Sequence, residues 1–544
     1  MGVINRIRDG RGALTAAAVW NVFDALLHVA IDEVEPPRVA GNVAVLLALG
    51  LSLAALRWWG GANVAAAVCG LAAGVVLGLN LAWVAVEGEL PIPAAVLIVV
   101  SLCLVLWAAW RFLAESPSGA TPNDTDPSRS KLWLVATGVL GVVSLAVSFL
   151  GGFVSSALRQ LHDDRLIAAD YWDDELVILS AGMGFDNIIG TSGEDFETTR
   201  EAMGSWYAEP NCVAPDGPLS TVVPASGLGP VIRGFVDYDD GLPIVTSWPV
   251  LTSTVHPEDF LFTLSDGSQV VPHAMTMTPN WETNERNTMV AFGDFGNRGI
   301  GDEPDKLFPV KLEIVDDGTP LTFVGPNGTQ SGVGLTWETD ISPYESGPKL
   351  VGAKLNHIGD QAEGEGGVSL LERQFLPNDE FTLYGGGDFK IRILTTGGFS
   401  PDGLTGVTPD QFADFFRLHA TGPGGESVLL TETDVNYDLD GGTLRIVGMS
   451  DLGKPAGDDV HYDDCYVEDS DNYIDIILEG DEAAARGLTH IEIPAGQDGY
   501  LPFYNPGGPG PEPFDGVRYA APGPPDLEPI INALDDPMRV SYAD

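Results

Sequence analysis

The sequence predicts an α-helical transmembrane bundle followed by an all-β region of tandem β-sandwiches. Long apolar stretches fill residues 1–160 of the 544-residue chain. Short alternating runs bounded by Asp-Gly, Asn-Gly and Gly-Gly turns fill most of the rest, which is typical of β-strands. The charge divides at the same place, because residues 1–160 carry 9 basic and 10 acidic side chains, and residues 161–544 carry 18 and 67.

The acidic excess excludes one class of partner and indicates an environment. A net charge of −50 repels a phosphate backbone, so nucleic acid is excluded as a general partner. The acidic residues are spread over 161–544 instead of forming a tail, which indicates a halophilic protein whose self-repulsion is screened by salt. A dedicated cation-binding surface is the alternative interpretation.

The membrane domain is expected to span residues 1–160 with five transmembrane helices. A hydrocarbon core of about 30 Å requires about 20 apolar residues, and the last four stretches have that length. The first stretch is weaker because Asn21, Asp24 and His28 interrupt it, and the number of spans is four if this stretch only lies on the membrane. The stretches are 13–31, 39–58, 62–86, 91–113 and 132–158.

The distribution of basic residues predicts the orientation of these spans. With five spans, seven Lys and Arg residues lie on the N-terminal side and three on the other, so the N-terminus is expected in the cytoplasm. The loop 115–131, rich in Pro, Ser, Thr and Asp, is then cytoplasmic. The chain is therefore expected to be a multi-pass cell-membrane protein, in contact with the lipid bilayer, with a large extracellular C-terminal domain. If the first stretch does not cross the membrane, the chain has four spans and the large C-terminal domain is expected in the cytoplasm instead.

Asp24 and His28 form an intramembrane polar pair, four residues apart on one helical face. Ionisable groups inside a span are typical of proton relays and ion paths. The alternative is a pair that faces the bundle interior and fixes helix packing, which is favoured because the other spans contribute no matching carboxylate.

Short strands are expected throughout the second part, for example at 260–264, 310–315 and 444–447. Only 409–419 and 481–486 have a pattern typical of a brief helix. The predicted divisions are a leading β segment or cap at 161–242, a first β-sandwich at 243–360, a second at 361–500, and a Gly/Pro-rich tail at 501–544.

Three matching segments indicate that the second sandwich duplicates the first. The matches occur in the same order along the chain, with longer connections in the second copy. Val255–Phe260 resembles Val407–Phe412, Val290–Asn297 resembles Val447–Lys454, and Phe308–Ile314 resembles Tyr473–Glu479.

These segments resemble the immunoglobulin-like modules of prokaryotic surface proteins. The resemblance rests on Pro257-Glu258-Asp259-Phe260 followed by Ser265-Asp266-Gly267, and on Pro409-Asp410-Gln411-Phe412. The second copy departs from the pattern by a longer segment after its corner, at 413–427. The resemblance implies tandem immunoglobulin-like β-sandwiches, which bind, space or adhere.

The cysteines allow one disulfide outside the membrane. Cys69 and Cys103 lie in predicted spans, so Cys212 and Cys465 are the only pair available in 161–544. No spacing motif requires this bond, and two free thiols are the alternative. Asn327-Gly328-Thr329 is an N-glycosylation acceptor sequence if the region is exported.

Two acidic segments are candidate calcium sites. Asn436, Asp438 and Asp440 alternate ahead of Gly441, as the oxygen ligands of a calcium loop do. The twelfth position is Val447 and not Glu, so a hairpin turn at Asp-Gly is the alternative. Asp237 and Asp239 form a similar, weaker pattern.

A third segment, with Asp459, His461 and Asp463, combines mixed ligands for a metal but is also expected from the acidic composition alone. No motif for nucleophilic catalysis, phosphate binding or dinucleotide binding is present, so no catalytic residue is predicted. Ca²⁺ is the only cofactor that the sequence suggests.

The predicted function is membrane-anchored binding or adhesion at the cell surface, or a structural role in the envelope of a halophile. The expected partners are another surface protein or a glycan. An extracytoplasmic metal-dependent hydrolase is the first alternative. A sensor or accessory subunit of a membrane complex is the second.

Overall fold

A computed structural model describes four helices between residues 10 and 114 and most of 164–543. It comprises 10–30, 36–56, 62–87 and 92–114, and then 164–543. The segments left out of the second range are 183–184, 192–194, 209–217, 226–231, 278–279, 281–282, 298, 300, 346, 359–386, 404, 453–471, 506–509 and 512–521. The chain divides into two compact units, Met1–Arg159 and a unit made of Gln160–Glu372 and Leu376–Asp544.

The first unit contains helices at four of the five predicted apolar stretches. They pack around a core of small side chains, with α1 against α2 and α4, and α3 against α2 and α4. The fifth predicted stretch, 132–158, lies outside the described residues. The helices are α1 Gly10–Ala30, α2 Pro36–Ala54, α3 Ala62–Glu87 and α4 Ile92–Ala114.

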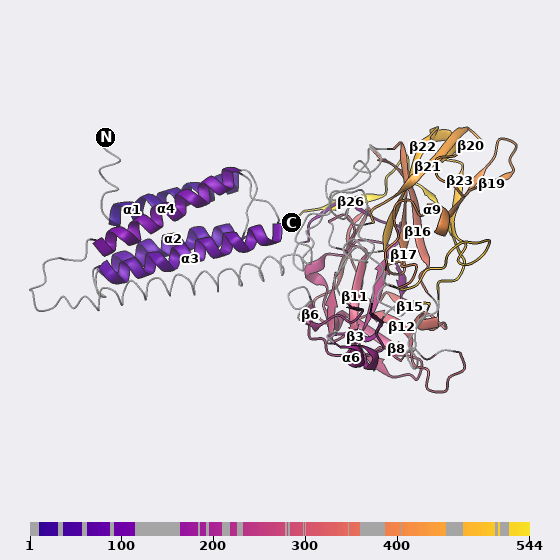
Figure 1. The fold of residues 1–544 in the computed structure, drawn as a ribbon, viewed down its shortest axis with the longest axis horizontal. Coiled ribbons are helices and arrows are strands. Elements are labelled where there is room, and N and C mark those ends of the chain that lie inside the picture. The colour runs from indigo at the N-terminus through magenta and orange to yellow at the C-terminus, as the bar shows by residue number, and fades with distance from the viewer. Residues whose placement is uncertain are drawn as a thin grey trace, which may run out of the picture. The chain divides into compact units, whose positions relative to one another are not determined.

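One described helical segment, Ala62–Leu81 in α3, has the length and hydropathy needed to cross a membrane. The apolar segments described in α2 and α4 are shorter, Gly41–Ala54 and Ile98–Ala114. The structure therefore provides one candidate span near the N-terminus, followed by a mostly β region (Figure 1).

The β unit begins with two sheets that share a hydrophobic core. A six-stranded sheet has the order β2-β7-β11-β10-β6, with β3 also paired to β7, and a four-stranded sheet has the order β15-β12-β8-β9. The first is built from β2 Ile178–Ala181, β3 Phe185–Ile189, β6 Arg233–Gly234, β7 Asp239–Thr246, β10 Ala274–Thr276 and β11 Thr288–Gly293. The second is built from β8 Phe260–Leu264, β9 Gln269–Val270, β12 Pro309–Ile314 and β15 Thr336–Glu338.

A second pair of sheets follows the same plan. Its strand orders are β20-β21-β22-β17-β16-β25 and β19-β18-β23-β24. The six-stranded sheet comprises β16 Leu350–His357, β17 Phe389–Thr395, β20 Asn436–Leu439, β21 Gly442–Ser450, β22 Tyr473–Gly480 and β25 Ile531–Asn532. The four-stranded sheet comprises β18 Arg417–Thr421, β19 Ser427–Leu430, β23 Leu488–Ile493 and β24 Asp526–Pro529.

Smaller elements complete the unit. The brief helices predicted from the sequence are confirmed at α9 Phe412–Phe415 and α10 Glu482–Ala485, whereas α6 Phe196–Glu201 was not expected. The remaining strands pair in twos: β1 Leu166–Asp170 with β26 Arg539–Tyr542, β4 Trp206–Tyr207 with β5 Leu219–Ser220, and β13 Thr322–Gly325 with β14 Gly328–Ser331.

Alternation explains why these segments form sheets with a shared core. In β8, Phe260, Phe262 and Leu264 are buried while Leu261 and Thr263 are less so, as expected for a strand with one face on a core. The first core joins Phe260 and Phe262 to Leu242, Ile244 and Met289 of the other sheet, among others. The second core likewise takes Ile391 and Ile476 from one sheet and Leu418 and Ile491 from the other.

The sheet pairings differ from the predicted divisions at three boundaries. The leading segment contributes β2 and β3 to the first six-stranded sheet, because both pair with β7. Strand β16, expected in the first sandwich, pairs with β17 of the second. The C-terminal tail supplies β24, β25 and β26, so three segments of 522–543 are built into sheets.

Two of the three sequence matches fall on strands with equivalent neighbours. The corners at Pro257 and Pro409 each lead into the strand at the centre of a four-stranded sheet, β8 and β18, and β11 and β21 each pair with the strand before them. The third match aligns β12 with β22, whose places differ. Strand β12 pairs with β8, whereas β22 lies between β21 and β17 in the six-stranded sheet.

Candidate functional site

The first predicted calcium segment is a tight β-hairpin. Strand β20 pairs with β21 in the register Asp438 to Thr443, and Asp440-Gly441 forms the turn, with Gly441 at φ 94°. Asn436, Asp438 and Asp440 are exposed, whereas Leu439 between them is buried. The three candidate ligands therefore lie on the solvent side of an extended strand and its turn, and calcium binding there stays a prediction.

The second predicted calcium segment is folded inward. Asp237 is exposed, but Asp239 is only 1% exposed, and its Oδ1 lies 3.0 Å from Nδ1 of His273. Burial raises the pKa of Asp239, and the contact with His273 opposes this effect. Asp240 accepts a hydrogen bond from the backbone N–H of Phe295 at 2.7 Å. The described carboxylates of this segment thus serve the interior of the first sheet pair.

The other predicted sites lie wholly or partly outside the described residues. Cys212 and Cys465 are outside them, as are Asp459, His461 and Asp463, and the side chains of Asp24 and His28 in α1 are not described. Among the residues that are described, no group of three or more His, Cys, Asp or Glu side chains is arranged to hold a metal ion.

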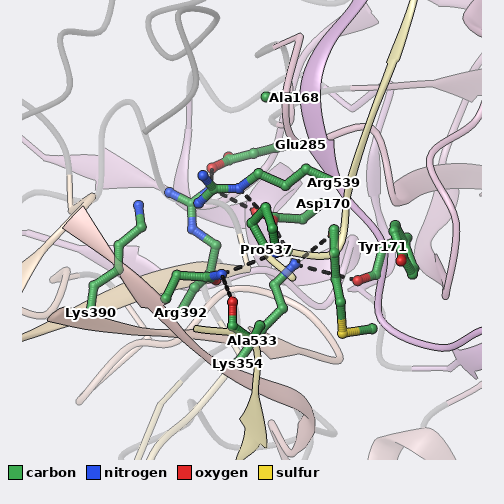
Figure 2. A network of polar contacts seen from close by, with 12 residues as sticks. Ala168, Asp170, Tyr171, Glu285, Lys354, Lys390, Arg392, Ala533, Pro537 and Arg539 are labelled. Atoms are coloured by element: carbon green, nitrogen blue, oxygen red, sulfur yellow. Dashed lines mark hydrogen bonds and ion pairs between the residues drawn. The ribbon is translucent and has the colours of Figure 1, made fainter. Parts of the chain in front are cut away.

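The structure reveals a site that the sequence did not predict, a buried ion network of eight charged residues. Figure 2 shows the part of it around Asp170, Glu285, Lys354, Lys390, Arg392 and Arg539. The network joins strands of the second sheet pair to the loop before β11 of the first pair and to both ends of the β unit. Seven members are at most 6% exposed, and Asp451 has a side chain that is 19% exposed. The members are Asp170, Glu285, Lys354, Lys390, Arg392, Asp451, Asp475 and Arg539.

Arg392 of β17 is the centre of the buried ion network. Its Nε and Nη2 donate to the two carboxylate oxygens of Asp475 at 2.8 Å each, a bidentate pair across neighbouring strands. Its Nη2 also contacts Asp451 at 2.7 Å, and its Nη1 contacts Glu285 at 2.9 Å and Asp170 at 3.2 Å. One guanidinium thus contacts carboxylates from four separate segments of the chain.

Asp170, at the end of β1, is the second centre. Lys354 donates to its Oδ1 at 2.5 Å, and Nε of Arg539 on β26 lies 3.3 Å from the same oxygen. Burial alone would raise the pKa of Asp170, but Lys354, Arg539 and Arg392 together outweigh it and hold that pKa well below its usual range. Asp170 is therefore ionised at neutral pH.

Lys354 itself is fully enclosed. Its Nζ also donates to the backbone carbonyl of Met538 at 3.0 Å, and it lies 5.1 Å from the ring centre of Trp172. Burial lowers the pKa of Lys354 to about 8, although Asp170 opposes the shift. A cation so deeply placed is stable only because carboxylate, carbonyl and aromatic ring surround it.

The geometry of the buried ion network indicates a lock and not a reaction centre. Its four cations and four carboxylates balance in formal charge, and nearly all of their polar atoms face one another. Such networks contribute little net stability when intact, but they are strongly destabilising when one partner is removed. They therefore specify one arrangement of the segments they join.

The scarcity of basic residues was the signal for this site. Residues 161–544 contain only 18 Lys and Arg, yet Lys390 and Arg392 stand two apart inside an apolar strand, Phe389–Thr395. Two basic residues at alternate positions of a strand usually indicate that this face of the strand is exposed to water. Here all seven residues of β17 are buried, because the first sheet pair and β1 cover the second face.

A partly open cavity of about 190 Å³ lies between the two sheet pairs. Leu179 and Ser180 of β2 and Trp337 of β15 line it from the first pair, and Leu350 and Val351 of β16 line it from the second. Lys349, Thr339, Ser342 and Thr396 add polar groups to the lining. A cavity with an aromatic wall and a few polar groups is typical of a small-molecule site.

Comparison with protein-family models, with curated proteins and with solved structures finds no match to this chain. The functional argument therefore rests on its own residues.

Proposed function

We propose that the chain is a multi-pass membrane protein of a halophile that displays tandem, immunoglobulin-like β-sandwiches on the cell surface for binding, adhesion or envelope structure. The observation that carries the proposal is the distribution of side chains in the helical unit, whose exterior is far more apolar than that of a bundle in water. Its described helices bury polar side chains and expose large apolar ones.

The interior of the helical unit combines mostly small apolar side chains with several buried polar ones. Asn21 of α1 donates to Ser101 of α4 at 2.8 Å, and both are nearly fully buried. Ser52 of α2 lies 3.4 Å from the carbonyl oxygen of Ala65 in α3. Small and hydrogen-bonding residues are typical of contacts between helices in lipid, where large apolar side chains gain nothing from leaving the surrounding hydrocarbon.

The exterior of the helical unit is apolar. Large side chains on all four helices are exposed, and a water-soluble bundle with such a surface would aggregate. Lipid tails explain them, and the tilted pair Trp107 and Trp110 in α4 suits an interfacial position. The exposed set includes Val19, Phe23, Leu47, Leu71, Val99, Leu106, Trp107 and Trp110. These features support several spans, with α3 as the longest apolar helix.

Two features support tandem sandwiches that arose by duplication. Each hydrophobic core draws side chains from both sheets of its pair, as in face-to-face packing. The corners before β8 and β18 also share a hydrogen bond, because the side chain of Asp259 accepts from the N–H of His256 and that of Gln411 accepts from the N–H of Thr408, each at 2.8 Å.

The buried ion network supports a display role. It fixes the two sheet pairs and both ends of the β unit to one another through the same carboxylates, so ligand contacts on either pair would keep a constant spacing. A rigid, acidic β unit that follows an apolar helical unit in the chain is suited to holding a binding surface outside the membrane.

Accessibility to an impermeant thiol reagent tests the location. Thr329, exposed on β14, is changed to Cys in a Cys212→Ser, Cys465→Ser background, and Ser118→Cys in the predicted cytoplasmic loop is the matched control. We expect Thr329→Cys to react in intact cells and Ser118→Cys only after lysis. Protection of Thr329→Cys until lysis would overturn the proposal.

A further inference from the structure

We infer that the cavity between the two sheet pairs is a binding site for an acidic saccharide, with Trp337 contacting a sugar ring and Lys349 pairing with its carboxylate. This inference deepens the proposed binding function and rests on it for the biological context. The argument depends on three features of the cavity lining: a lysine without an ion-pair partner among the described residues, an indole wall, and the hydroxyl group of Thr396.

Lys349 differs from the other described lysines because it has no carboxylate partner among the described residues. Lys306, Lys311, Lys354 and Lys390 each form an ion pair, and Lys349 forms none. The chain has 77 acidic residues against 27 basic ones, so an unpaired lysine is unexpected from its composition. Lys349 is half-buried and lines the cavity, so its side chain can supply a cation to the anionic group of a ligand.

Trp337 supplies the wall that a sugar ring requires. It lies on β15, directly opposite Leu312 of β12, and is half-buried against the first core. Gly182 leaves room for the indole, since a Cβ at that position would lie 3.2 Å from Cη2 of Trp337. An indole offers a broad apolar face and little conformational freedom, so it binds a ring at low entropic cost.

The hydroxyl of Thr396 completes the polar lining. Oγ1 of Thr396 accepts a hydrogen bond from the backbone N–H of Lys349 at 3.1 Å, which leaves its own O–H available to donate. Thr339 also lines the cavity, but its O–H donates to the carbonyl oxygen of Ile341 at 3.4 Å, and Ser342 is fully buried. The O–H of Thr396 is therefore the group suited to a ring or hydroxyl oxygen of a saccharide.

The size of the cavity limits the ligand. A volume of about 190 Å³ is below the roughly 300–1,000 Å³ of sites that enclose drug-sized molecules, so one ring fits and the rest of a chain must project outward. The net charge of −50 would repel an acidic ligand in dilute buffer. In molar salt the Debye length is about 3 Å, so the distant carboxylates of the protein are screened. The ion pair between the ligand and Lys349 then dominates the electrostatic energy of binding.

Calorimetric titration of the full-length protein, in detergent and molar salt, tests the site. Trigalacturonate is the acidic probe, maltotriose the neutral one, and sodium sulfate the simple anion. We expect trigalacturonate to bind wild type and to bind Lys349→Gln about 10- to 100-fold more weakly, since a hydrogen bond to a charged group contributes about 1.5–3 kcal/mol. Lys311→Gln, a lysine paired with Glu313, is the matched control and should bind as wild type does.

Trp337→Phe should also weaken trigalacturonate binding while it keeps an aromatic side chain for the first core. Equal unfolding midpoints for all variants establish that they are folded. Equal affinity of wild type and Lys349→Gln would overturn the inference, as would no binding of trigalacturonate. Complete competition by millimolar sulfate would identify a simple anion site instead. Thiol labelling of Thr329→Cys reports location alone, so failure of either experiment is distinguishable from failure of the other.

Discussion

Replacement of Asp475 by Asn tests whether the buried ion network locks the β unit together. Asp475 lies on β22 and is 1% exposed, and it receives Nζ of Lys390 at 2.7 Å and two nitrogens of Arg392 at 2.8 Å. The substitution preserves the shape of the side chain and removes one negative charge. Two buried cations then lose the carboxylate that they share.

The expected loss is large. Removal of one partner from a buried pair costs about 3–5 kcal/mol, because the remaining charge stays desolvated. Glu479 on the same strand provides the control. It pairs with Arg445 near the surface, where the side chain of Glu479 is 38% exposed and that of Arg445 is 34% exposed. Exposed pairs contribute about 0–1 kcal/mol, so Glu479→Gln should be nearly neutral. The two variants should therefore differ by several kcal/mol in free energy of unfolding, which is a large fraction of the roughly 5–15 kcal/mol by which a typical domain is stable.

Urea titration followed by tryptophan fluorescence measures both variants in the full-length protein. Urea is preferable to guanidinium, because guanidinium is a salt and would screen the charges under study. Trp172, packed beside Lys354, and Trp248, buried in the first core, report on the two sides of the network. The loss in Asp475→Asn should persist in molar salt, since buried pairs are screened little. A loss below about 1 kcal/mol, or equal losses in both variants, would refute the assignment of a lock.

Further predictions address pH, packing, calcium and salt. Burial, with Asp317 and Glu258 nearby, raises the pKa of Asp259 from 3.8 to about 7. Between these two values the folded state holds a proton that the unfolded state releases, so the free energy of unfolding falls as pH rises. Asp259→Asn, the neutral equivalent of Gln411, should flatten this pH dependence in urea titrations, and an unchanged dependence would contradict the buried acid. Gly352→Ala should destabilise by about 1–3 kcal/mol, because its Cβ would lie 2.5 Å from the Trp172 ring, and an unaltered midpoint would refute that close contact. A calcium loop at Asn436–Gly441 would give a rise in the unfolding midpoint with millimolar Ca²⁺ that Asp438→Asn abolishes, whereas a plain hairpin gives no rise. Loss of β circular dichroism is expected when salt is withdrawn, and full retention in dilute buffer would argue against the halophilic interpretation.

Local patterns predicted the elements well where one face met a core. Alternation placed β8 at 260–264 without error, and the Asp-Gly and Gly-Gly signals located the turns at Gly267, Gly318 and Gly441, which have positive φ. These signals depend on residues that are neighbours in sequence, and a single chain therefore contains them in full.

Non-local pairing was the part that the sequence did not show. Strand β16 follows the first sheet pair directly, yet it pairs with β17 and β25 of the second. The buried ion network was missed for the same reason, because the alternation Lys390-Ile391-Arg392-Ile393 is identical for a face in water and for a face covered by another sheet. Only the positions of Asp170 and Glu285, more than 100 residues earlier in the chain, distinguish the two.

The pairing of β1 with β26 has a consequence for how the molecule is made. Asp170 and Arg539 are matched across these two strands although 369 residues separate them in the chain. A nascent polypeptide therefore cannot complete the ion network around Asp170 before β26 has been translated. Assembly of the β unit is thus late relative to the synthesis of its first strand.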